Sequence, residues 1–314
     1  MDRIATNTAY TSVLNNLMAA EIAQTNAGNQ ISSTEKATDL EGYGTGAESL
    51  MAMQATNTQV TGYLNNSQIV AAKLTMQDTG LNQVASSATS SISSITNAIA
   101  TGNGSTLMSE LQDSFGGAIQ GLNTQFNGEY VFAGGQVNTQ PVSATSLSDL
   151  TAAPSVASLF HNDNRQISTQ VDQNTTVSTG FLADQVGTPL FTALQSIEAY
   201  DQGPNGPFGT TLTSAQQTFL TQQLATLNTV STNLNNVVAQ NGLAQSEVTN
   251  TQTALTQRQT MVQGLIGTAT QANLAQAATN LQQAQLSIQA AGQVFQALNS
   301  SSLLNTLTAS TPVA

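Results

Sequence analysis

The residues of this chain that could do chemistry are few and scattered. His161 is the single histidine, and there is no cysteine. A serine-histidine-aspartate triad could therefore be built in one way only, and neither a histidine cluster nor a thiolate site is available for a metal ion. His161 stands in a polar stretch, which favours a loop histidine over a general base. A hydrolase would have almost no residues from which to build an active site.

Two further strings and one pair of aspartates resemble ligand or catalytic motifs, but each lacks a part that its motif requires. Residues 42–46 (Gly-Tyr-Gly-Thr-Gly) lack the spacing of a phosphate-binding loop, and no apolar strand precedes them. Residues 33–36 (Ser-Thr-Glu-Lys) have the serine-lysine spacing of penicillin-binding enzymes without the companion Lys-Thr-Gly. Asp163 and Asp172 lack the regular oxygen ligands and the turn glycine of a calcium loop. We therefore expect no enzymatic activity, no cofactor and no metal ion.

The composition points away from an ordinary globular enzyme. Only 7% of the 314 residues are charged and 4% are aromatic, so the surface must consist mostly of uncharged polar side chains. The five Lys and Arg residues are scattered and the net charge is −12, which leaves no cationic patch for nucleic acid or an anionic membrane. No basic segment followed by an apolar one opens the chain, and no stretch approaches about 18 apolar residues. Neither a cleaved export signal nor membrane insertion is expected.

The positions of the prolines predict where long helices can form. Five of the six prolines lie between Pro141 and Pro207, and the sixth is Pro312. An interior proline removes a helical hydrogen bond and clashes with the preceding turn. Residues 1–140 and 208–311 are therefore free to form long helices on either side of a middle segment of different character.

Apolar residues recur at alternating steps of three and four residues in both halves of the chain. One such seam runs from Leu50 to Ile99, and a second runs from Leu220 to Ala269. A period of 3.5 residues keeps one narrow seam of a helix against another helix, as in a coiled coil or bundle. Two polar residues on the first seam are interpreted as register or partner devices, the alternative being that either side chain simply reaches solvent. They are Asn57 and Asp78.

The two ends of the chain carry shorter apolar stripes. A step of five residues separates Ala269 from a new phase that begins at Leu274, which predicts a break between two helices. Near the N-terminus a stripe around Leu14 fades towards Gly28 and predicts a short helix that is marginal alone. Residues 38–46 are interpreted as an irregular connector, with Thr45 as a possible helix cap. We expect the two terminal stripes to pair through Leu14, Leu17, Ile22, Leu274, Leu281, Ile288, Phe295 and Leu298.

These patterns predict a mainly α fold with a small inserted β-rich domain. Residues 136–187 carry short alternating runs and nearby prolines, which favour strands. The helices should form an elongated antiparallel rod or coiled coil in which the N- and C-terminal helices pair. The expected domains are a terminal helical core (1–40 with 272–314), a helical rod (41–135 with 188–271) and the inserted β-rich domain (136–187).

Several stretches resemble the flagellin superfamily, and the likeness extends over nearly the whole chain. Residues 3–7 (Arg-Ile-Ala-Thr-Asn) match its N-terminus. Residues 127–135 (Asn-Gly-Glu-Tyr-Val-Phe-Ala-Gly-Gly) are similar to the exit from its N-terminal helical half, in a wording more typical of hook-associated proteins than of flagellin. Residues 273–277 and 302–304 also fit. The chain departs from the family at residues 39–44, where many flagellins have an acidic pair followed by proline, and in a tail that runs past the terminal leucines.

The resemblance implies a secreted structural subunit of the extracellular bacterial flagellum, which leaves the cell by type III export. The expected function is that of a hook-filament junction protein, which adapts the hook to the flagellin filament. The alternative is a flagellin subunit of the filament itself. The implied partners are further copies, neighbouring hook-associated proteins, flagellin and an export chaperone. The terminal segments are implied to be disordered in the monomer and to become helical on assembly. A fibrous adhesin competes less well, because neither a signal nor an anchor is visible.

Overall fold

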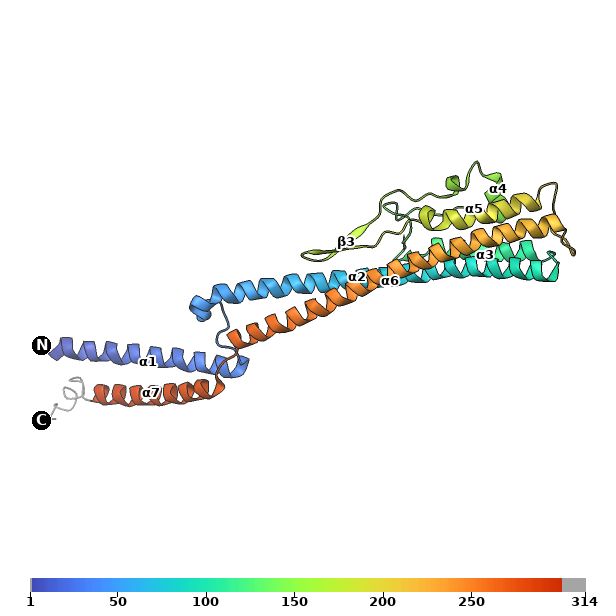
Figure 1. Cartoon of the computed structure of the whole chain (residues 1–314). Coiled ribbons are helices and arrows are strands. Elements are labelled where there is room, and N and C mark those ends of the chain that lie inside the picture. The colour runs from blue at the N-terminus through green and yellow to red at the C-terminus, as the bar shows by residue number, and fades with distance from the viewer. Residues whose placement is uncertain (1, 301–314) are drawn as a thin grey trace, which may run out of the picture. The chain divides into compact units, whose positions relative to one another are not determined.

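The computed structural model describes the backbone of residues 2–300 and the side chains of residues 8–299. Residues 302–304 and the C-terminal tail, which entered the sequence comparison, lie outside the described part. The described chain is mainly helical with two small antiparallel sheets (Figure 1), which confirms the predicted fold class. It forms two compact units. One unit contains the described residues up to Gln59 and from Gln259 onward, and the other contains Val60–Arg258. The three-part division expected from the sequence stays a prediction.

The terminal unit is built around two helices from opposite ends of the chain. Helix α1 (Asp2–Ser33) packs side by side with α7 (Leu274–Ser300) (Figure 1). Helix α1 continues through Gly28, where the apolar stripe had suggested an end. A single glycine inside a helix costs only about 1 kcal/mol relative to alanine, and the packing against α7 extends over this part of α1.

The connectors on either side of this helix pair are hydrogen-bonded to each other. The N–H of Ala272 donates to the carbonyl of Thr34 (2.9 Å), and the N–H of Lys36 donates to the carbonyl of Thr270 (2.7 Å). Helix α6 (Ser214–Thr270) ends shortly before Leu274, the first residue of α7. The break between two helices that the five-residue step predicted is therefore confirmed. The suggested cap at Thr45 is wrong, because Thr45 lies inside a 3-10 helix, η1 (Glu41–Gly46), that runs directly into α2 (Ala47–Thr101).

Helices α2 and α6 carry the two predicted seams. None of the fifteen seam positions of α2 is exposed, and neither is any of the α6 positions that continue the same period. From Val60 onward the buried face of α2 widens, because further elements pack against it there. The α2 seam consists of Leu50, Met53, Asn57, Val60, Leu64, Ser67, Ala71, Leu74, Asp78, Leu81, Ala85, Ala88, Ile92, Ile95 and Ile99.

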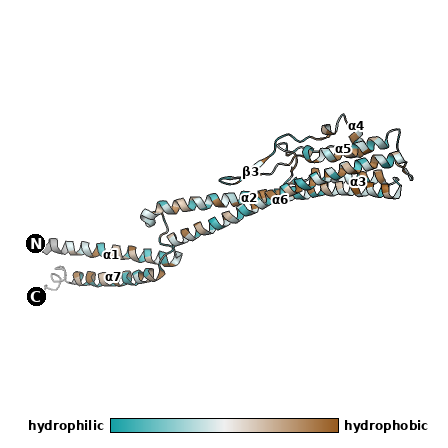
Figure 2. Cartoon of the chain, viewed as in Figure 1, coloured by the Kyte–Doolittle hydropathy of each residue, from teal (hydrophilic) through white to brown (hydrophobic). Residues whose placement is uncertain are grey.

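The Val60–Arg258 unit has one main hydrophobic core, to which α2, α3 (Leu107–Leu122), α5 (Ala183–Asp201) and α6 contribute. Figure 2 shows apolar residues along these helices. Phe115 and Phe191 meet edge to face with ring centroids 4.8 Å apart, a geometry that aromatic rings prefer. Pro189 lies inside α5. The helix tolerates the missing N–H because Leu190 and Phe191 beside it are fully buried in this core.

The segment expected to be β-rich contains less strand than predicted. Its helical pieces are α4 (Leu147–Ala152) and the 3-10 helix η2 (Val156–Leu159), and its one hairpin joins β3 (Ser168–Asp172) to β4 (Thr175–Ser178). A second, very short hairpin lies before it, between β1 (Gln125–Phe126) and β2 (Glu129–Tyr130). Short apolar runs between turn residues do not by themselves distinguish strands from short helical turns.

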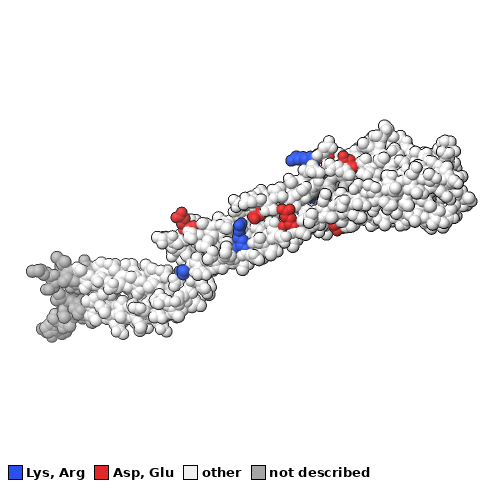
Figure 3. Space-filling view, in the orientation of Figure 1, with Lys and Arg blue, Asp and Glu red and all other residues white. Residues whose placement is uncertain are grey.

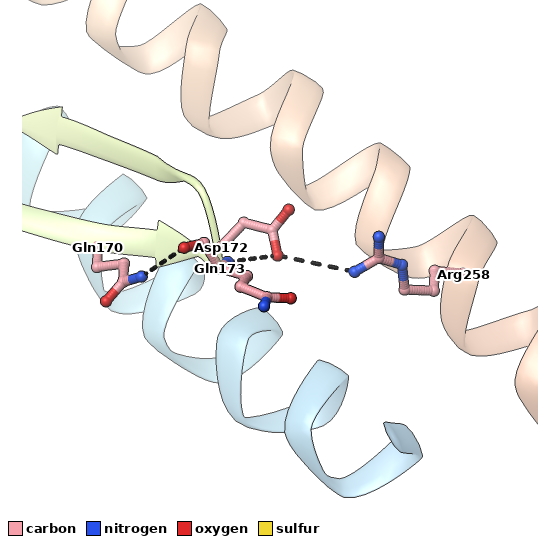
Figure 4. A network of polar contacts seen from close by, with 4 residues as sticks. All are labelled: Gln170, Asp172, Gln173 and Arg258. Carbon is pink, nitrogen blue, oxygen red and sulfur yellow. Dashed lines mark hydrogen bonds and ion pairs between the residues drawn. The ribbon is translucent and has the colours of Figure 1, made fainter. Parts of the chain in front are cut away.

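The β3-β4 hairpin is attached to both long helices of its unit. Val171 and Val177 are buried in a small separate core with Val70, Leu74 and Val248. Close to the turn of the hairpin, the Asp172 carboxylate lies 3.9 Å from the Arg258 guanidinium on α6 (Figure 4). The Asn66 amide of α2 donates to the carbonyl of Gln170 (2.6 Å). The hairpin therefore bridges α2 and α6 through one apolar cluster and two polar contacts.

Candidate assembly interface

The seam between α1 and α7 is built largely from alanine. Ala20 and Ala27 of α1 are buried, as are Ala277 and Ala284 of α7. Small side chains let two helices approach closely, so their burial depends on the neighbouring helix and not on their own hydrophobicity. Near the N-terminal end of α1, Tyr10 and Phe295 close the seam with ring centroids 5.6 Å apart and ring planes at 80°.

The predicted interface residues fall into two groups. Leu17, Leu281, Ile288 and Leu298 are half-buried, and the first three lie on the sides of α1 and α7 that face each other. The other four predicted residues are about half exposed or more. Leu14 is 52% exposed and Ile22 61%, while Leu274 is 47% and Phe295 50% exposed.

Sequence reasoning missed several residues of this region. Ala20 and Ala27 lie in the seam, but alanine is too small to stand out in an apolar stripe. Leu286 and Val294 of α7 are exposed apolar residues outside the seam phase. Residues eight positions apart are turned about 80° from each other around a helix, so these two do not form a stripe that the spacing could have identified.

The helix pair carries almost no charge. No Asp, Glu, Lys or Arg follows Arg258 in the sequence, so α7 has none. Among the described side chains of α1, Glu21 is the single charged residue. On the face of the described helix pair that Figure 3 shows, no charged side chain is visible. Burying such a surface against another protein requires little desolvation of ions, which is the main polar penalty of association.

Residues 127–135, which carried the most specific resemblance, form a connector held by backbone contacts. Asn127 and Gly128 have positive φ angles of 52° and 85°, as the two-residue turn between β1 and β2 requires. Gly134 has φ 68°, and a Cβ there would collide with the Asp163 carboxylate. That carboxylate accepts from the N–H of Gly135 (2.8 Å) and of Arg165 (3.0 Å). These two hydrogen bonds lower the pKa of Asp163, the bond from Gly135 contributing most.

The remaining candidates for chemistry are dispersed. His161 Nε2 lies 3.0 Å from Ser143 Oγ, but Asp163 is occupied by the backbone contacts just described. In the part of the chain that the structure describes, no cluster of three or more His, Cys, Asp or Glu side chains is placed to hold a metal ion. No described helix combines the length and hydrophobicity that crossing a membrane requires.

Comparisons with known proteins give structural matches. No protein-family model matches the sequence, and no curated protein does either. A flagellar hook-associated protein of Vibrio parahaemolyticus matches with a TM-score of 0.58 and 15% sequence identity, over 71% of this chain and 97% of that one. FlgL of Bacillus cereus matches with a TM-score of 0.54 and 14% identity, over 69% and 98%. The chain therefore has the fold of these flagellar hook-associated proteins, in agreement with the resemblance that residues 127–135 suggested.

Proposed function

We propose that this protein is a structural subunit of the bacterial flagellum and forms the junction between hook and filament. The observation that carries the proposal is the shared fold, since two hook-associated proteins match over more than two thirds of this chain and nearly all of their own length. The sequence of residues 127–135 supports the same assignment. The protein would act after export, as part of the extracellular flagellum and together with hook-associated proteins and flagellin.

The α1-α7 pair is the proposed assembly interface. Its two helices are nearly uncharged and present Leu14, Ile22, Leu274 and Phe295 to solvent. A solitary pair of helices with a narrow alanine seam gains little burial to offset the entropy of ordering the chain. Contact with neighbouring subunits would supply the missing burial, and Leu17, Leu281 and Ile288 would keep the two helices together within it.

Deletion of the gene tests the proposal directly. Electron microscopy of the deletion strain should show hooks without filaments, because flagellin then has no surface on which to polymerise, and flagellin should be shed into the medium. Restoring the gene should restore filaments. Normal filaments in the deletion strain would contradict the proposal.

Copy number separates the junction protein from the alternative, a filament flagellin. Quantitative mass spectrometry of purified flagella should find few copies of this chain per hook for a junction. Antibody labelling confined to the point where hook and filament meet would agree with that count. Labelling along the whole filament would favour a flagellin instead.

A further inference from the structure

Four asparagines of this chain are each followed by glycine. In such a pair the backbone nitrogen of the glycine can attack Cγ of the asparagine, because glycine has no side chain to hinder the approach. The new N–Cγ bond closes a five-membered succinimide, and the Cγ–Nδ2 bond breaks to release ammonia, which takes up the proton of the glycine N–H. Water then opens the ring to aspartate or isoaspartate. The four pairs are Asn103-Gly104, Asn127-Gly128, Asn205-Gly206 and Asn241-Gly242.

Two requirements decide which of these pairs reacts in the folded protein. Water must reach the pair, because water carries the proton away from the glycine nitrogen and later opens the ring. The glycine N–H must also be free to turn towards the asparagine side chain, and a hydrogen bond to a carbonyl holds it in place. The fold therefore selects among four pairs that are chemically alike.

The pair Asn241-Gly242 is shielded inside α6. Asn241 is fully buried, and its Nδ2 donates to the carbonyl of Leu74 (3.0 Å). Both residues lie in the interior of the helix, where backbone N–H groups are bonded to the preceding turn. This pair should not react while α6 is folded.

Two further pairs have their glycine N–H engaged. The N–H of Gly104 donates to the carbonyl of Gly209 (2.8 Å), and the N–H of Gly206 donates to the carbonyl of Gly203 (3.1 Å). Each of these hydrogen bonds must break before the nitrogen can attack. The fold therefore slows the reaction at both pairs.

The pair Asn127-Gly128 is the one that the fold leaves open. Both residues are exposed at the turn between β1 and β2. Within the described part of the chain, the N–H of Gly128 donates no hydrogen bond and the Asn127 side chain makes none. A Cβ placed on Gly128 would meet nothing within 4 Å, whereas one on Gly104 would lie 2.8 Å from the Leu212 side chain.

The β1-β2 turn can also open locally. Ring closure rotates the Gly128 nitrogen towards the Asn127 side chain, so the turn must open for the reaction. Strands β1 and β2 have only two residues each, and a two-stranded hairpin is marginally stable at best by itself. Val131 and Phe132, which follow the hairpin, are buried. The opening therefore need not disturb the core.

We infer that Asn127 is a deamidation site of the folded protein and that the fold protects the other three Asn-Gly pairs. The inference goes beyond the proposed function and does not depend on it. The product carries a carboxylate two residues before Glu129. Isoaspartate also lengthens the main chain by one methylene, which the geometry of a two-residue turn does not accommodate. Deamidation thus adds negative charge to the turn and weakens the hairpin.

Peptide mapping by mass spectrometry of the full-length protein tests the inference. The purified protein is kept at mildly alkaline pH and is then digested with pepsin at acid pH, where further deamidation is slow. Asn127 should lose its amide at least about fivefold faster than each of the other three asparagines, since one hydrogen bond of ordinary net strength restrains an opening by about that factor. In concentrated denaturant the four pairs should react at similar rates.

The variant Asn127→Gln is the matched control, because glutamine would have to close a six-membered ring, which forms far more slowly. Anion-exchange chromatography of the aged wild type should show more acidic species that the aged variant lacks. A rate at Asn127 no higher than at Asn103 or Asn205 in the folded protein would overturn the inference. A preference for Asn127 that persists in denaturant would overturn it too, because the local sequence and not the fold would then select the site.

Discussion

Gln77 and Asn241 are buried amides that join separate segments of the Val60–Arg258 unit. The Nε2 of Gln77 donates to the carbonyl of Val131 (3.2 Å) and to that of Thr179. Gln77 thereby attaches to α2 the two segments that follow the hairpins, one directly after β2 and the other directly after β4. The Nδ2 of Asn241, on the α6 seam, donates to the carbonyl of Leu74 (3.0 Å) and lies 3.4 Å from Asp78 Oδ1. This contact agrees with the interpretation of Asp78 as a register device, since polar seam residues fix the register of packed helices.

Replacing Gln77→Leu should destabilise this unit. The carbonyls of Val131 and Thr179 would lose their donor inside the fold, and a buried acceptor left without its partner costs about 1–3 kcal/mol. Denaturant unfolding followed by circular dichroism measures the change. Gln68→Leu, at an exposed position of the same helix, is the control and should stay within about 0.5 kcal/mol of the wild type. Equal stability of the two variants would contradict the role given to Gln77.

The lowered pKa of Asp163 predicts that the free energy of unfolding depends on pH in the acid range. Its pKa is lower in the folded protein because the carboxylate accepts from the N–H of Gly135 and of Arg165. A group with a lowered folded pKa stabilises the fold above its unfolded pKa, and this contribution is lost as the pH falls through the folded pKa. The wild type should therefore lose unfolding free energy below about pH 4.

The variant Asp163→Asn should be less stable than the wild type at neutral pH and should lose less on acidification. Unfolding measured at a series of pH values from neutral to acid checks both statements. Glu247→Gln, at an exposed site of α6, serves as the control. Parallel pH profiles for the wild type and Asp163→Asn would show that these hydrogen bonds do not contribute.

The packing of α1 on α7 can be disrupted with a single charge. Leu281 and Ile288 are half-buried in the seam, so Leu281→Glu or Ile288→Glu would place a carboxylate between two helices whose described side chains include no cation. We expect either variant to lose incorporation into flagella, assayed by immunoblot of purified flagella. Circular dichroism of the purified variant should still show the α2-α6 body folded.

Gln289→Glu adds the same charge at an exposed position of α7 and should be incorporated. Its behaviour separates the effect of position from the effect of charge. Normal assembly of Ile288→Glu would contradict the pairing of α1 with α7 as the basis of the interface.

The β3-β4 hairpin should depend on its apolar contact more than on its ion pair. Val177 is buried in the small core with Val171 and Val248, and Val177→Ala should cost about 1–3 kcal/mol of unfolding free energy. Arg258 is half-exposed and lies 3.9 Å from Asp172, and exposed ion pairs contribute about 0–1 kcal/mol. Denaturant unfolding of Val177→Ala and Arg258→Ala compares the two. A larger loss in Arg258→Ala would reverse this order.

The whole chain is poor in charge, with five Lys and Arg and 17 Asp and Glu in 314 residues. In the described structure, the one ion pair identified joins Arg258 and Asp172. The charges are concentrated away from α7, which has none. Association through this helix pair must therefore depend on apolar burial and uncharged hydrogen bonds.

Self-association of the purified protein should consequently change little with ionic strength. At 0.1 M, salt largely screens interactions between exposed charges that lie more than about 10 Å apart, and the α1-α7 surface offers only Glu21 among its described side chains. Sedimentation velocity at low and high sodium chloride measures the effect. A marked loss of association at high salt would show that charges elsewhere on the chain carry the contact.

The sequence by itself determined the long helices and the place where the C-terminal ones separate. The seam from Leu50 to Ile99 and the break after Ala269 are local properties of spacing, because a helix repeats its faces every few residues whatever it packs against. The scarcity of charge and of catalytic side chains is a matter of composition. Both could be read without knowing which helices meet.

Only the tertiary structure decided which side of each terminal helix is covered. Ala20 and Ala27 are buried while Leu14 and Ile22 stay exposed, the reverse of what hydrophobicity alone predicts. Burial in a helix pair depends on how closely the backbones approach, and small residues permit the close approach that larger ones prevent. The tertiary structure also decided that α5 continues through Pro189. The packing of the neighbouring residues in the core outweighs the hydrogen bond that the proline removes. The sequence shows which residues are apolar and how they are spaced along a helix, but the partner surface decides which of them are buried.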